Sequence, residues 1–251
     1  MLCRIFLIID LMQKNVVITG ANGALCKVLV FKLRKEGFKV KLYTHTKSLA
    51  DNKTVFFWDI DRGYIDDKPL INCNHIIHLS GYSIMRPWTD NNKKLMYSSR
   101  VIAAKILLDS CKNKNIKLET FISASAIGYY GLNSVGLKSE DSLPDSDWIS
   151  RMCVDWENYT IKFKDLGARV AQMRISLLLS NNSGFLKPIL FFMRCGLAFI
   201  FGNGKNVIEW IHIEDVAKFV VFALKNKKVS GPYNLATEHK INQKKFIEII
   251  N

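Results

Sequence analysis

Apolar and polar positions near the start of the chain predict a strand, a turn and a helix. The run Val16-Val17-Ile18 is wholly apolar, as in a parallel strand buried on both faces. Two glycines follow, and then apolar residues recur at steps of three and four, at positions 25, 28, 29 and 33. This spacing places one apolar stripe on a helix. Residues 16–34 are therefore predicted to open a βαβ unit.

The alternation of strand and helix continues along the chain. Apolar runs typical of strands occupy residues 40–43, 55–58, 75–79, 120–123 and 170–179. Helical spacing of apolar residues is found at 93–113, at 148–164 and after Asp215. Strands that alternate with helices predict an α/β fold with a doubly wound parallel sheet of Rossmann type.

The pattern loosens after residue 180, where several glycines and Pro188 interrupt it. We expect a small substrate-binding subdomain there. The chain stops within a helix predicted to begin near Asn242, so part of this subdomain is expected to be missing, and a start upstream of Met12 accounts for the apolar first residues. The predicted divisions are 14–180 for the Rossmann domain with 205–225 packing back on it, 181–204 and 226–251 for the partial subdomain, and 1–13 for an N-terminal extension.

The glycine turn after the first strand is a candidate site for a dinucleotide pyrophosphate. A helix that starts there offers unpaired N–H groups and the positive end of its dipole, and glycine lets a ligand approach the backbone. A turn that only reverses the chain is the alternative, because glycine turns are common in α/β proteins. The expected cofactor contacts in this turn are Gly20, Ala21, Asn22, Gly23, Ala24 and Leu25.

The end of the second strand bears on the choice between NAD and NADP. A carboxylate there would bond a ribose 2′-hydroxyl and repel a 2′-phosphate. Residues 44–47 contain none, which favours NADP (NADPH), with His45 and Lys47 as contacts. An ordinary polar turn is the alternative. Asp59 and Ile60, after the third strand, are expected at the adenine edge.

The end of the fifth strand is the expected place for chemistry. The segment Ser-Ala-Ser-Ala-Ile-Gly-Tyr-Tyr-Gly at 123–131 leaves the carboxyl end of that strand, where ligands bind in such sheets. Small residues, hydroxyls and two tyrosines gather there. His75 and His78, in the buried fourth strand, are interpreted as core residues rather than ligands.

Charge and composition narrow the classes of function. The 251-residue chain is 49% hydrophobic, which is enough for a sizeable core, and has a net charge of +14. The positive charge is spread along the sequence, so we expect no nucleic-acid partner. The apolar first twelve residues are too short to span a membrane. The six cysteines form no CxxC pair, which predicts reduced thiols in a cytoplasmic protein without a metal site.

Several motifs in a fixed order give the chain a specific resemblance. They are GANGA at 20–24, IIHLSG at 76–81, SSR at 98–100, SASAIGYYG at 123–131, CVDWE at 153–157 and WIHIEDV at 210–216. Together they resemble the YfcH group of epimerase family proteins, which belongs to the atypical, extended short-chain dehydrogenases/reductases. The resemblance implies an NAD(P)-binding Rossmann domain and a small C-terminal substrate domain. Further cofactor contacts are expected at Leu79, Ser80, Gly81 and Arg100.

The resemblance implies chemistry less directly than it implies the fold. Related enzymes pair a Ser or Thr with Tyr-x-x-x-Lys, whose lysine lowers the tyrosine pKa so that the phenol exchanges a proton while hydride moves. Ile149 and Cys153 stand at the Tyr and Lys positions. Ser125 corresponds to the hydroxyl, and Tyr129 or Tyr130 is the candidate substitute phenol. A tight turn packed beside the cofactor is the alternative role for the two tyrosines.

Other positions also depart from the pattern of this group. Cys26 replaces the third glycine of the turn, His45 stands where the group usually has Arg, and Pro87 interrupts the usual Arg-Trp-Thr. Our leading interpretation is an NAD(P)-binding oxidoreductase or epimerase with an unknown carbonyl or sugar-nucleotide-like substrate. The alternative is a dinucleotide-binding protein without catalysis, a sensor or a decaying relic. A homodimer through helices 93–113 and 148–164 is a candidate assembly.

Overall fold

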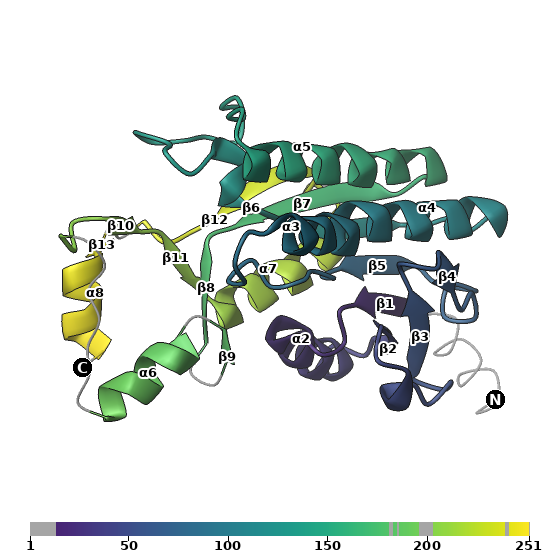
Figure 1. Ribbon diagram of the computed structural model, residues 1–251. Helices are drawn as coiled ribbons and strands as arrows, with labels where there is room; N and C mark the ends of the chain where they lie inside the picture. The colour runs from purple at the N-terminus through teal and green to yellow at the C-terminus, as the bar shows by residue number, and fades with distance from the viewer. Residues whose placement is uncertain (1–13, 181–182, 185, 196–202, 239–240, 251) are drawn as a thin grey trace.

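A large, mostly parallel sheet forms the centre of the molecule (Figure 1). The computed structural model describes residues 14–180, 183–184, 186–195, 203–238 and 241–250. The strands of the sheet are β1 (Asn15–Thr19), β2 (Lys39–Thr44), β3 (Val55–Asp59), β4 (Tyr64–Ile65), β5 (His75–His78), β6 (Thr120–Ala126), β7 (Arg169–Ile175) and β12 (Gly231–Leu235). Their order is β12-β7-β6-β5-β1-β2-β3-β4, and only the β3–β4 pair is antiparallel.

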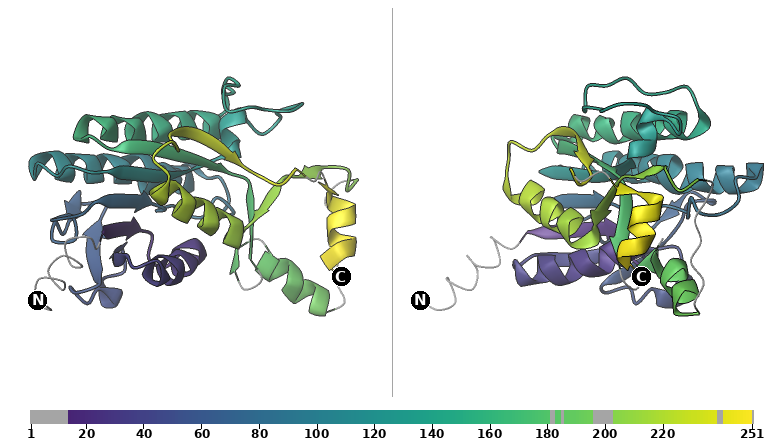
Figure 2. Two further views of the ribbon diagram at one scale, coloured as in Figure 1. Left: turned by 180° about the vertical axis from the view of Figure 1, so that it is seen from behind. Right: turned by 90° about the vertical axis from the view of Figure 1, so that its left-hand side faces the viewer.

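Helices cover both faces of this sheet (Figures 1 and 2). The helical segments are α2 (Ala24–Lys35), η1 (Lys47–Leu49), α3 (Asp90–Tyr97), η2 (Ser98–Ile102), α4 (Ala103–Asn113), η3 (Ile127–Tyr130), α5 (Trp148–Ile161), η4 (Lys162–Leu166) and α7 (Ile213–Lys225). On one face Leu29 and Leu33 of α2 share a buried cluster with Val216 and Val220 of α7. The segments α4 and α5 cover the opposite face. The predicted doubly wound fold is therefore confirmed.

The first strand, β1, lies in the middle of the sheet, and its three inner residues are all apolar. Val16, Val17 and Ile18 are fully buried, and β1 pairs in parallel with β2 on one side and β5 on the other. Parallel strands end at the same edge of a sheet, so the segments that follow β1, β5 and β6 meet there. The predicted cofactor contacts after these strands thus lie at one edge.

The run 170–179, predicted as one strand, is two strands in the structure. β7 stays in the main sheet, whereas β8 (Leu177–Ser180) pairs with β11 (Trp210–His212) in a separate sheet. The break lies at Ser176, whose N–H and hydroxyl both donate to the carbonyl of Leu235 at the end of β12. The apolar pattern continues across the break because both strands are buried against other elements.

The helix predicted over 93–113 begins earlier and is not uniform. It starts at Asp90, because the Thr89 side chain accepts a hydrogen bond from the N–H of Asn92 and caps the first turn. A π-helical segment, η2, separates α3 from α4. Such wide turns are rare and free backbone carbonyls from their usual partners, and they occur frequently at functional sites.

A smaller part projects beyond the carboxyl edge of the sheet (Figure 2). Besides β8 and β11 it holds β9 (Ser183–Gly184), α6 (Leu186–Arg194), β10 (Val207–Ile208), β13 (Ile241–Asn242) and α8 (Gln243–Ile250). Its core joins Leu179 and Leu186 to Phe246 and Ile247. The prediction that all of 226–251 belongs to this part is wrong for Gly231–Leu235, because β12 pairs with β7 at the edge of the main sheet. Residues 1–13 lie outside the described chain.

Candidate functional site

The β1–α2 turn is shaped by close contact with the end of β5. Gly20 has a φ of +78°, and a Cβ built on it would lie 2.9 Å from the carbonyl oxygen of Leu79. A backbone oxygen cannot move aside as a flexible side chain can. Gly20 is therefore required both by its left-handed conformation and by the neighbouring strand.

The N-terminus of α2 is open to a ligand. Gly23 is the N-cap and provides no side-chain hydrogen bond to the helix, and the first turn, from Ala24 onward, holds no acidic residue. The positive end of the helix dipole and the first N–H groups are thus left without a side-chain cap within the described chain. The side chain of Leu25 is buried in the core, so this residue has only its backbone to offer a ligand. Cys26 is also buried, which raises the pKa of its thiol to about 12, so it packs as a neutral group.

The turn is fastened to the end of β2. The Asn22 side chain donates to the hydroxyl of Thr46 at 3.2 Å and accepts from that of Thr44 at 3.3 Å. His45 and Lys47 are exposed beside it. The first carboxylate after β2, on Asp51, faces away to accept the N–H groups of residues 53, 54 and 55, and these bonds lower its pKa. The β2 end therefore presents a histidine and a lysine without a carboxylate beside them.

Asp59 and Ile60 follow β3 at the same edge. The Asp59 carboxylate accepts the N–H of Arg62 at 3.1 Å and forms an ion pair with its guanidinium at 3.7 Å. Ile60 is half-buried and packs against the core. The Asp59 carboxylate thus stabilises the turn that follows β3 by bonding to Arg62.

Thr19 and His78 connect the ends of β1 and β5 through buried hydrogen bonds. The Thr19 hydroxyl accepts the N–H groups of Leu79 and Ser80, both at 3.0 Å, and lies 2.9 Å from Nδ1 of His78. The other ring nitrogen, Nε2, lies 3.2 Å from the carbonyl of Arg100, which can only accept. Nε2 therefore carries the proton and Nδ1 accepts from Thr19. Burial lowers the pKa of His78 to about 4, which keeps the ring neutral.

The end of β6 is built around a buried ion pair. Arg174 on β7 donates from Nε and Nη2 to the two carboxylate oxygens of Glu157 on α5, at 3.0 and 2.9 Å. Ser125 donates its hydroxyl to the same carboxylate at 2.6 Å. All three side chains are nearly inaccessible to solvent. The Ser125 hydroxyl is therefore held inside the protein and does not face the edge where a ligand would lie.

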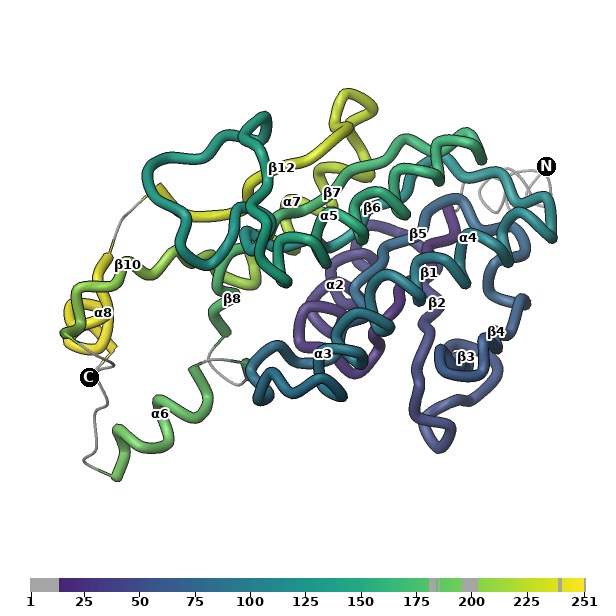
Figure 3. Tube along the Cα trace, turned by 45° about the horizontal axis from the view of Figure 1, so that its top comes forward, coloured from purple at the N-terminus to yellow at the C-terminus, as the bar shows by residue number. Residues whose placement is uncertain are grey.

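The hydroxyl of Tyr130 belongs to the same network. It accepts from Nη1 of Arg174 at 2.8 Å and lies 2.7 Å from Oδ1 of Asn234. Arg174 also bonds the carbonyl of Glu140, whose carboxylate accepts the N–H of Asn234. These bonds attach the loop 131–147 to β12, and the two segments run side by side in Figure 3. Tyr130 thus has a structural role here.

Tyr129 differs from Tyr130 in what its hydroxyl meets. Its ring is half-buried, and the guanidinium carbon of Arg174 lies 3.5 Å from the ring centre. Within the described chain its hydroxyl makes no hydrogen bond, whereas those of Ser125 and Tyr130 are both engaged. Tyr129 is the candidate phenol that the structure leaves available, stacked on a fixed cation.

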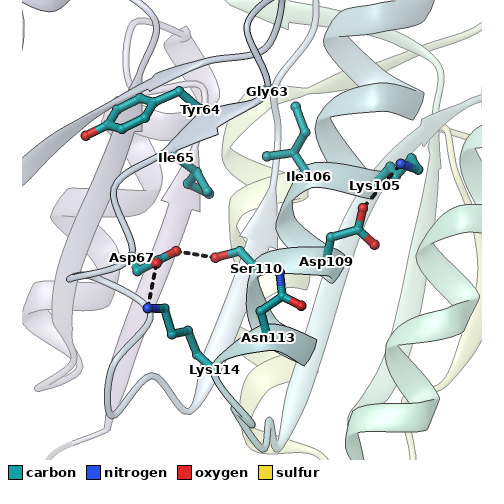
Figure 4. A pocket seen from close by; sticks show the side chains of 10 residues that line it. All are labelled: Gly63, Tyr64, Ile65, Asp67, Lys105, Ile106, Asp109, Ser110, Asn113 and Lys114. Carbon is teal, nitrogen blue, oxygen red and sulfur yellow. Dashed lines mark hydrogen bonds and ion pairs between the residues drawn. The ribbon is translucent and has the colours of Figure 1, made fainter.

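A polar cavity of about 540 Å³ lies elsewhere, between β4 and the outer side of α4 (Figure 4). Asp67 accepts from Ser110 and pairs with Lys114 at 3.1 Å, and Lys105 pairs with Asp109 at 3.3 Å. Its charges therefore satisfy each other. It includes the last turn of α4, at the edge opposite the carboxyl ends of the strands, so it does not belong to the candidate site.

The comparison with protein families agrees with this geometry. Residues 16–236 match the NAD dependent epimerase/dehydratase family. This chain belongs to that family. The match covers every strand of the main sheet from β1 onward to β12, so the family assignment describes the whole Rossmann part. The expected resemblance to an epimerase family is thereby confirmed at the level of the family.

Known relatives in the family are moderately similar. The epimerase family protein SH2119 of Staphylococcus haemolyticus is 29% identical over 231 residues, which cover 89% of this chain and 75% of that protein. The protein SAR0825 of Staphylococcus aureus is 28% identical over 225 residues, with the same coverage of both chains.

Solved structures share the fold. The nucleoside-diphosphate sugar epimerase of Corynebacterium glutamicum has a TM-score of 0.80 and 28% identity over 96% of this chain, which spans only half the length of that protein (50%). The human epimerase family protein SDR39U1, solved with NADPH, has a TM-score of 0.78 at 22% identity over 92% of this chain and 77% of its own chain. At that identity the likeness concerns the fold alone.

The positions where family relatives were expected to carry Tyr and Lys are apolar here. Ile149 faces Gly128, and a Cβ on that glycine would lie 3.2 Å from the Ile149 side chain. Cys153 is fully buried, and burial raises the pKa of its thiol to about 12. Neither side chain can exchange a proton at neutral pH. Within the described residues, no group of His, Cys, Asp or Glu is placed to hold a metal ion, and no helix is long and apolar enough to cross a membrane.

The network of Glu157, Arg174 and Asn234 was not predicted from the sequence. One signal was present, because an arginine in the middle of the apolar run 170–179 must be buried, and a buried charge needs a partner. The sequence did not indicate which acid would supply it. Asn234 gave no signal, since it was expected in the smaller subdomain.

Proposed function

We propose that this protein is a nicotinamide-dinucleotide-binding oxidoreductase or epimerase that acts on a carbonyl or sugar-nucleotide-like substrate. The observation that carries the proposal is the open N-terminus of α2 behind Gly20 and Gly23, at the edge where β1, β5 and β6 end. Membership of the NAD dependent epimerase/dehydratase family supports the cofactor class. The nucleoside-diphosphate sugar epimerase at 28% identity supports the substrate class.

The residues at this edge fit a dinucleotide. The backbone of residues 20–25 would hold the pyrophosphate, because its N–H groups and helix dipole favour an anion. His45 and Lys47 would meet the adenosine ribose, and Ile60 the adenine. Residues 79–81 and Arg100 would line the path towards β6. The bound cofactor supplies or accepts the hydride, and the protein has to orient it and exchange the proton.

We propose NADPH over NADH as the preferred cofactor. The β2 end offers two cationic or protonatable side chains, and its first carboxylate, on Asp51, is directed to backbone N–H groups. A 2′-phosphate would therefore meet His45 and Lys47 without repulsion. The preference is expected to be modest because both side chains are exposed, where solvent weakens charge pairing.

Tyr129 is our proposed proton-exchanging residue. Its hydroxyl is the one of the three candidate hydroxyls that makes no hydrogen bond in the described chain, and it follows β6 at the carboxyl edge. The Arg174 guanidinium against its ring is a fixed positive charge close to the phenol. In this arrangement Ser125 and Tyr130 hold Arg174 and Glu157 in place instead of touching substrate.

A dinucleotide-binding protein without turnover is the second candidate. The specific observation that favours it is the burial of the Ser125 and Tyr130 hydroxyls in the ion-pair network, together with Ile149 and Cys153. A homodimer through α4 and α5 and a cytoplasmic location stay predictions, as does the absence of a nucleic-acid partner.

The cofactor assignment is tested by titrating NADPH and NADH into wild type, Gly23→Val and Gly37→Ala while following cofactor fluorescence. A branched side chain at 23 would stand 3.2 Å or less from the Gly20 carbonyl, where the pyrophosphate must approach. Gly37 lies between α2 and β2, at the other end of the helix from the turn, and has nothing within 4 Å of an added Cβ. We expect G23V to lose binding and G37A to keep it. Equal affinity in wild type and G23V would refute the assignment.

A further inference from the structure

Arg100 is a partly buried cation with half of its guanidinium unused. Nη1 donates to the carbonyls of Tyr82 at 3.0 Å and Met96 at 3.1 Å. Within the described chain, Nε and Nη2 donate no hydrogen bond, and no carboxylate forms an ion pair with this side chain. Burial lowers the pKa of Arg100 to about 10, so it stays protonated at neutral pH. Neither Nε nor Nη2 is among the fully buried polar atoms of the described chain, so both are open to a ligand.

The position of Arg100 is determined by a chain of buried contacts. Arg100 lies in the π-helical segment η2, and its carbonyl accepts from His78, which is in turn held by Thr19. Thr19 directly precedes Gly20. The wide turn of the helix is therefore attached to the same strand end that shapes the β1–α2 turn.

The unused edge of the guanidinium faces the end of β5. A Cβ built on Gly81 would lie 3.0 Å from Nη2 of Arg100, so a larger residue there would press on the guanidinium. Gly81 is exposed and directly follows the residues that bond Thr19. On the other side, the guanidinium carbon lies 5.5 Å from the ring centre of Trp156, and the Cys153 thiol is close enough to interact with its charge.

We propose that Arg100 binds the nicotinamide mononucleotide half of the dinucleotide and replaces, from the η2 segment, the positive charge that is missing at position 153 of α5. The proposal rests on the proposed cofactor function. It follows from three placements: Arg100 lies against Trp156 of α5, beside Cys153, and against Gly81 after the end of β5. The end of β2, where the adenosine half is proposed to bind, lies on the other side of β1 from β5, so that half does not reach Arg100. Arg100 is a binding and positioning residue and moves no proton.

The test compares whole cofactor with its adenosine half. Arg100→Met, Arg100→Lys and wild type are titrated with the tighter of NADPH and NADH, and with the matching fragment, 2′,5′-ADP or 5′-AMP. Lys105→Met is the matched control, since this cation on α4 pairs with Asp109 on the outer surface. Thermal unfolding is measured for each variant, because R100M also removes a donor from the carbonyls of Tyr82 and Met96.

We expect R100M to bind the whole cofactor about 10- to 100-fold more weakly, the range for a lost charge-assisted hydrogen bond. Binding of the fragment should be unchanged in R100M, and R100K should recover part of the affinity. K105M should match wild type for both ligands. A purely structural Arg100 would change thermal unfolding without separating cofactor from fragment, and that result would overturn the proposal.

The remaining outcomes separate this inference from the proposed function. Wild type that binds neither ligand would overturn the cofactor function and the inference with it. Wild type that binds, with R100M equally tight, would overturn the inference alone. The double variant R100M/C153K should regain affinity for the whole cofactor, because a lysine at 153 would return a cation to the same place. No regain in a folded double variant would show that the two positions do not face one ligand group.

Discussion

The β1–α2 turn and the end of β6 lie at the same edge of the sheet but are built in opposite ways. The turn depends on backbone and on missing side chains, at Gly20 and Gly23. The end of β6 depends on side chains, with Arg174 and Glu157 buried and hydrogen-bonded. A site made of backbone tolerates change in most side chains. A site made of side chains can lose its chemistry by two substitutions, as Ile149 and Cys153 illustrate.

Between these two regions lies the chain of contacts from Thr19 through His78 to Arg100. Thr19 and His78 are fully buried, and Arg100 carries the contacts to the carboxyl edge of the sheet. The contrast suggests that binding and catalysis can be perturbed separately in this protein.

The largest effect is expected on turnover. Tyr129→Phe should slow hydride exchange by about 10²- to 10⁴-fold, the usual contribution of general acid–base catalysis. Cofactor affinity should not change. The measurement is transfer of label from NADPH across a panel of carbonyl compounds and sugar nucleotides, with Tyr129→Leu to confirm the role of the hydroxyl. Undiminished turnover in Y129F would remove this phenol from the mechanism, and cofactor binding without turnover in wild type would favour the non-catalytic candidate.

The buried ion pair should dominate stability at the end of β6. Glu157→Ala leaves Arg174 buried without its carboxylate, which should lower the free energy of unfolding by about 3–5 kcal/mol. Replacing both residues by methionine should recover much of this loss. Lys112→Ala, which breaks an exposed pair with Asp165, is the control and should cost less than about 1 kcal/mol. Urea unfolding measures all of them, and a loss in E157A as small as in the control would contradict the network's importance.

Stability should fall on acidification because His78 and His75 are buried as neutral rings. Burial lowers both pKa values to about 4, against about 6.5 in the unfolded chain. The unfolded state therefore binds protons first, and each histidine contributes stability that is complete above pH 6.5 and is lost as the pH falls towards 4. Each contribution is about 3 kcal/mol.

This pH dependence can be assigned by substitution. His78→Gln should reduce the slope of unfolding free energy against pH between pH 6.5 and 4 by about half. Of the two histidines that bind a proton on unfolding, only His75 would then remain. The exposed His45→Gln is the control and should leave the slope as in wild type. A slope that H78Q does not change would contradict the assignment to His78.

The β1–α2 turn should respond to a single methyl group. Gly20→Ala and Gly37→Ala both place alanine at positive φ, which costs about 1–2 kcal/mol. Only Gly20 has a backbone oxygen 2.9 Å from the added Cβ, whereas Gly37 has nothing within 4 Å. The free energy of unfolding should thus fall by about 1 kcal/mol more in G20A than in G37A. Equal losses of unfolding free energy in the two variants would mean that the backbone at the end of β5 shifts to make room for the added methyl group.

The smallest effect is the choice of cofactor. NADPH should bind only a few-fold more tightly than NADH, because exposed charge pairs contribute about 0–1 kcal/mol. Lys47→Gln should reduce the preference, and Lys53→Gln, outside the 44–47 segment, should not. Competition between the two cofactors at pH 7 and low salt measures it. A preference for NADH would refute the assignment of the β2 end.

The amino-acid sequence by itself determined the glycine turn and the alternation of strands and helices from β1 to β7. Each of these depends on local spacing: an apolar run for β1, a stripe at steps of three and four for α2, and glycine where the backbone turns. The family followed from the same kind of information, because short motifs such as those at 20–24 and 123–131 keep their order along the chain.

Only the tertiary structure decided which groups meet. The hydroxyls of Ser125, Tyr129 and Tyr130 are equivalent in sequence, yet two of them are bound by Arg174 and Glu157 from other elements, and one is left. The same holds for Ser176, where a bond to the distant Leu235 ends β7. A hydrogen bond forms only when packing brings donor and acceptor within about 3 Å. Local sequence patterns do not predict which residues come this close, since the partners lie far apart along the chain.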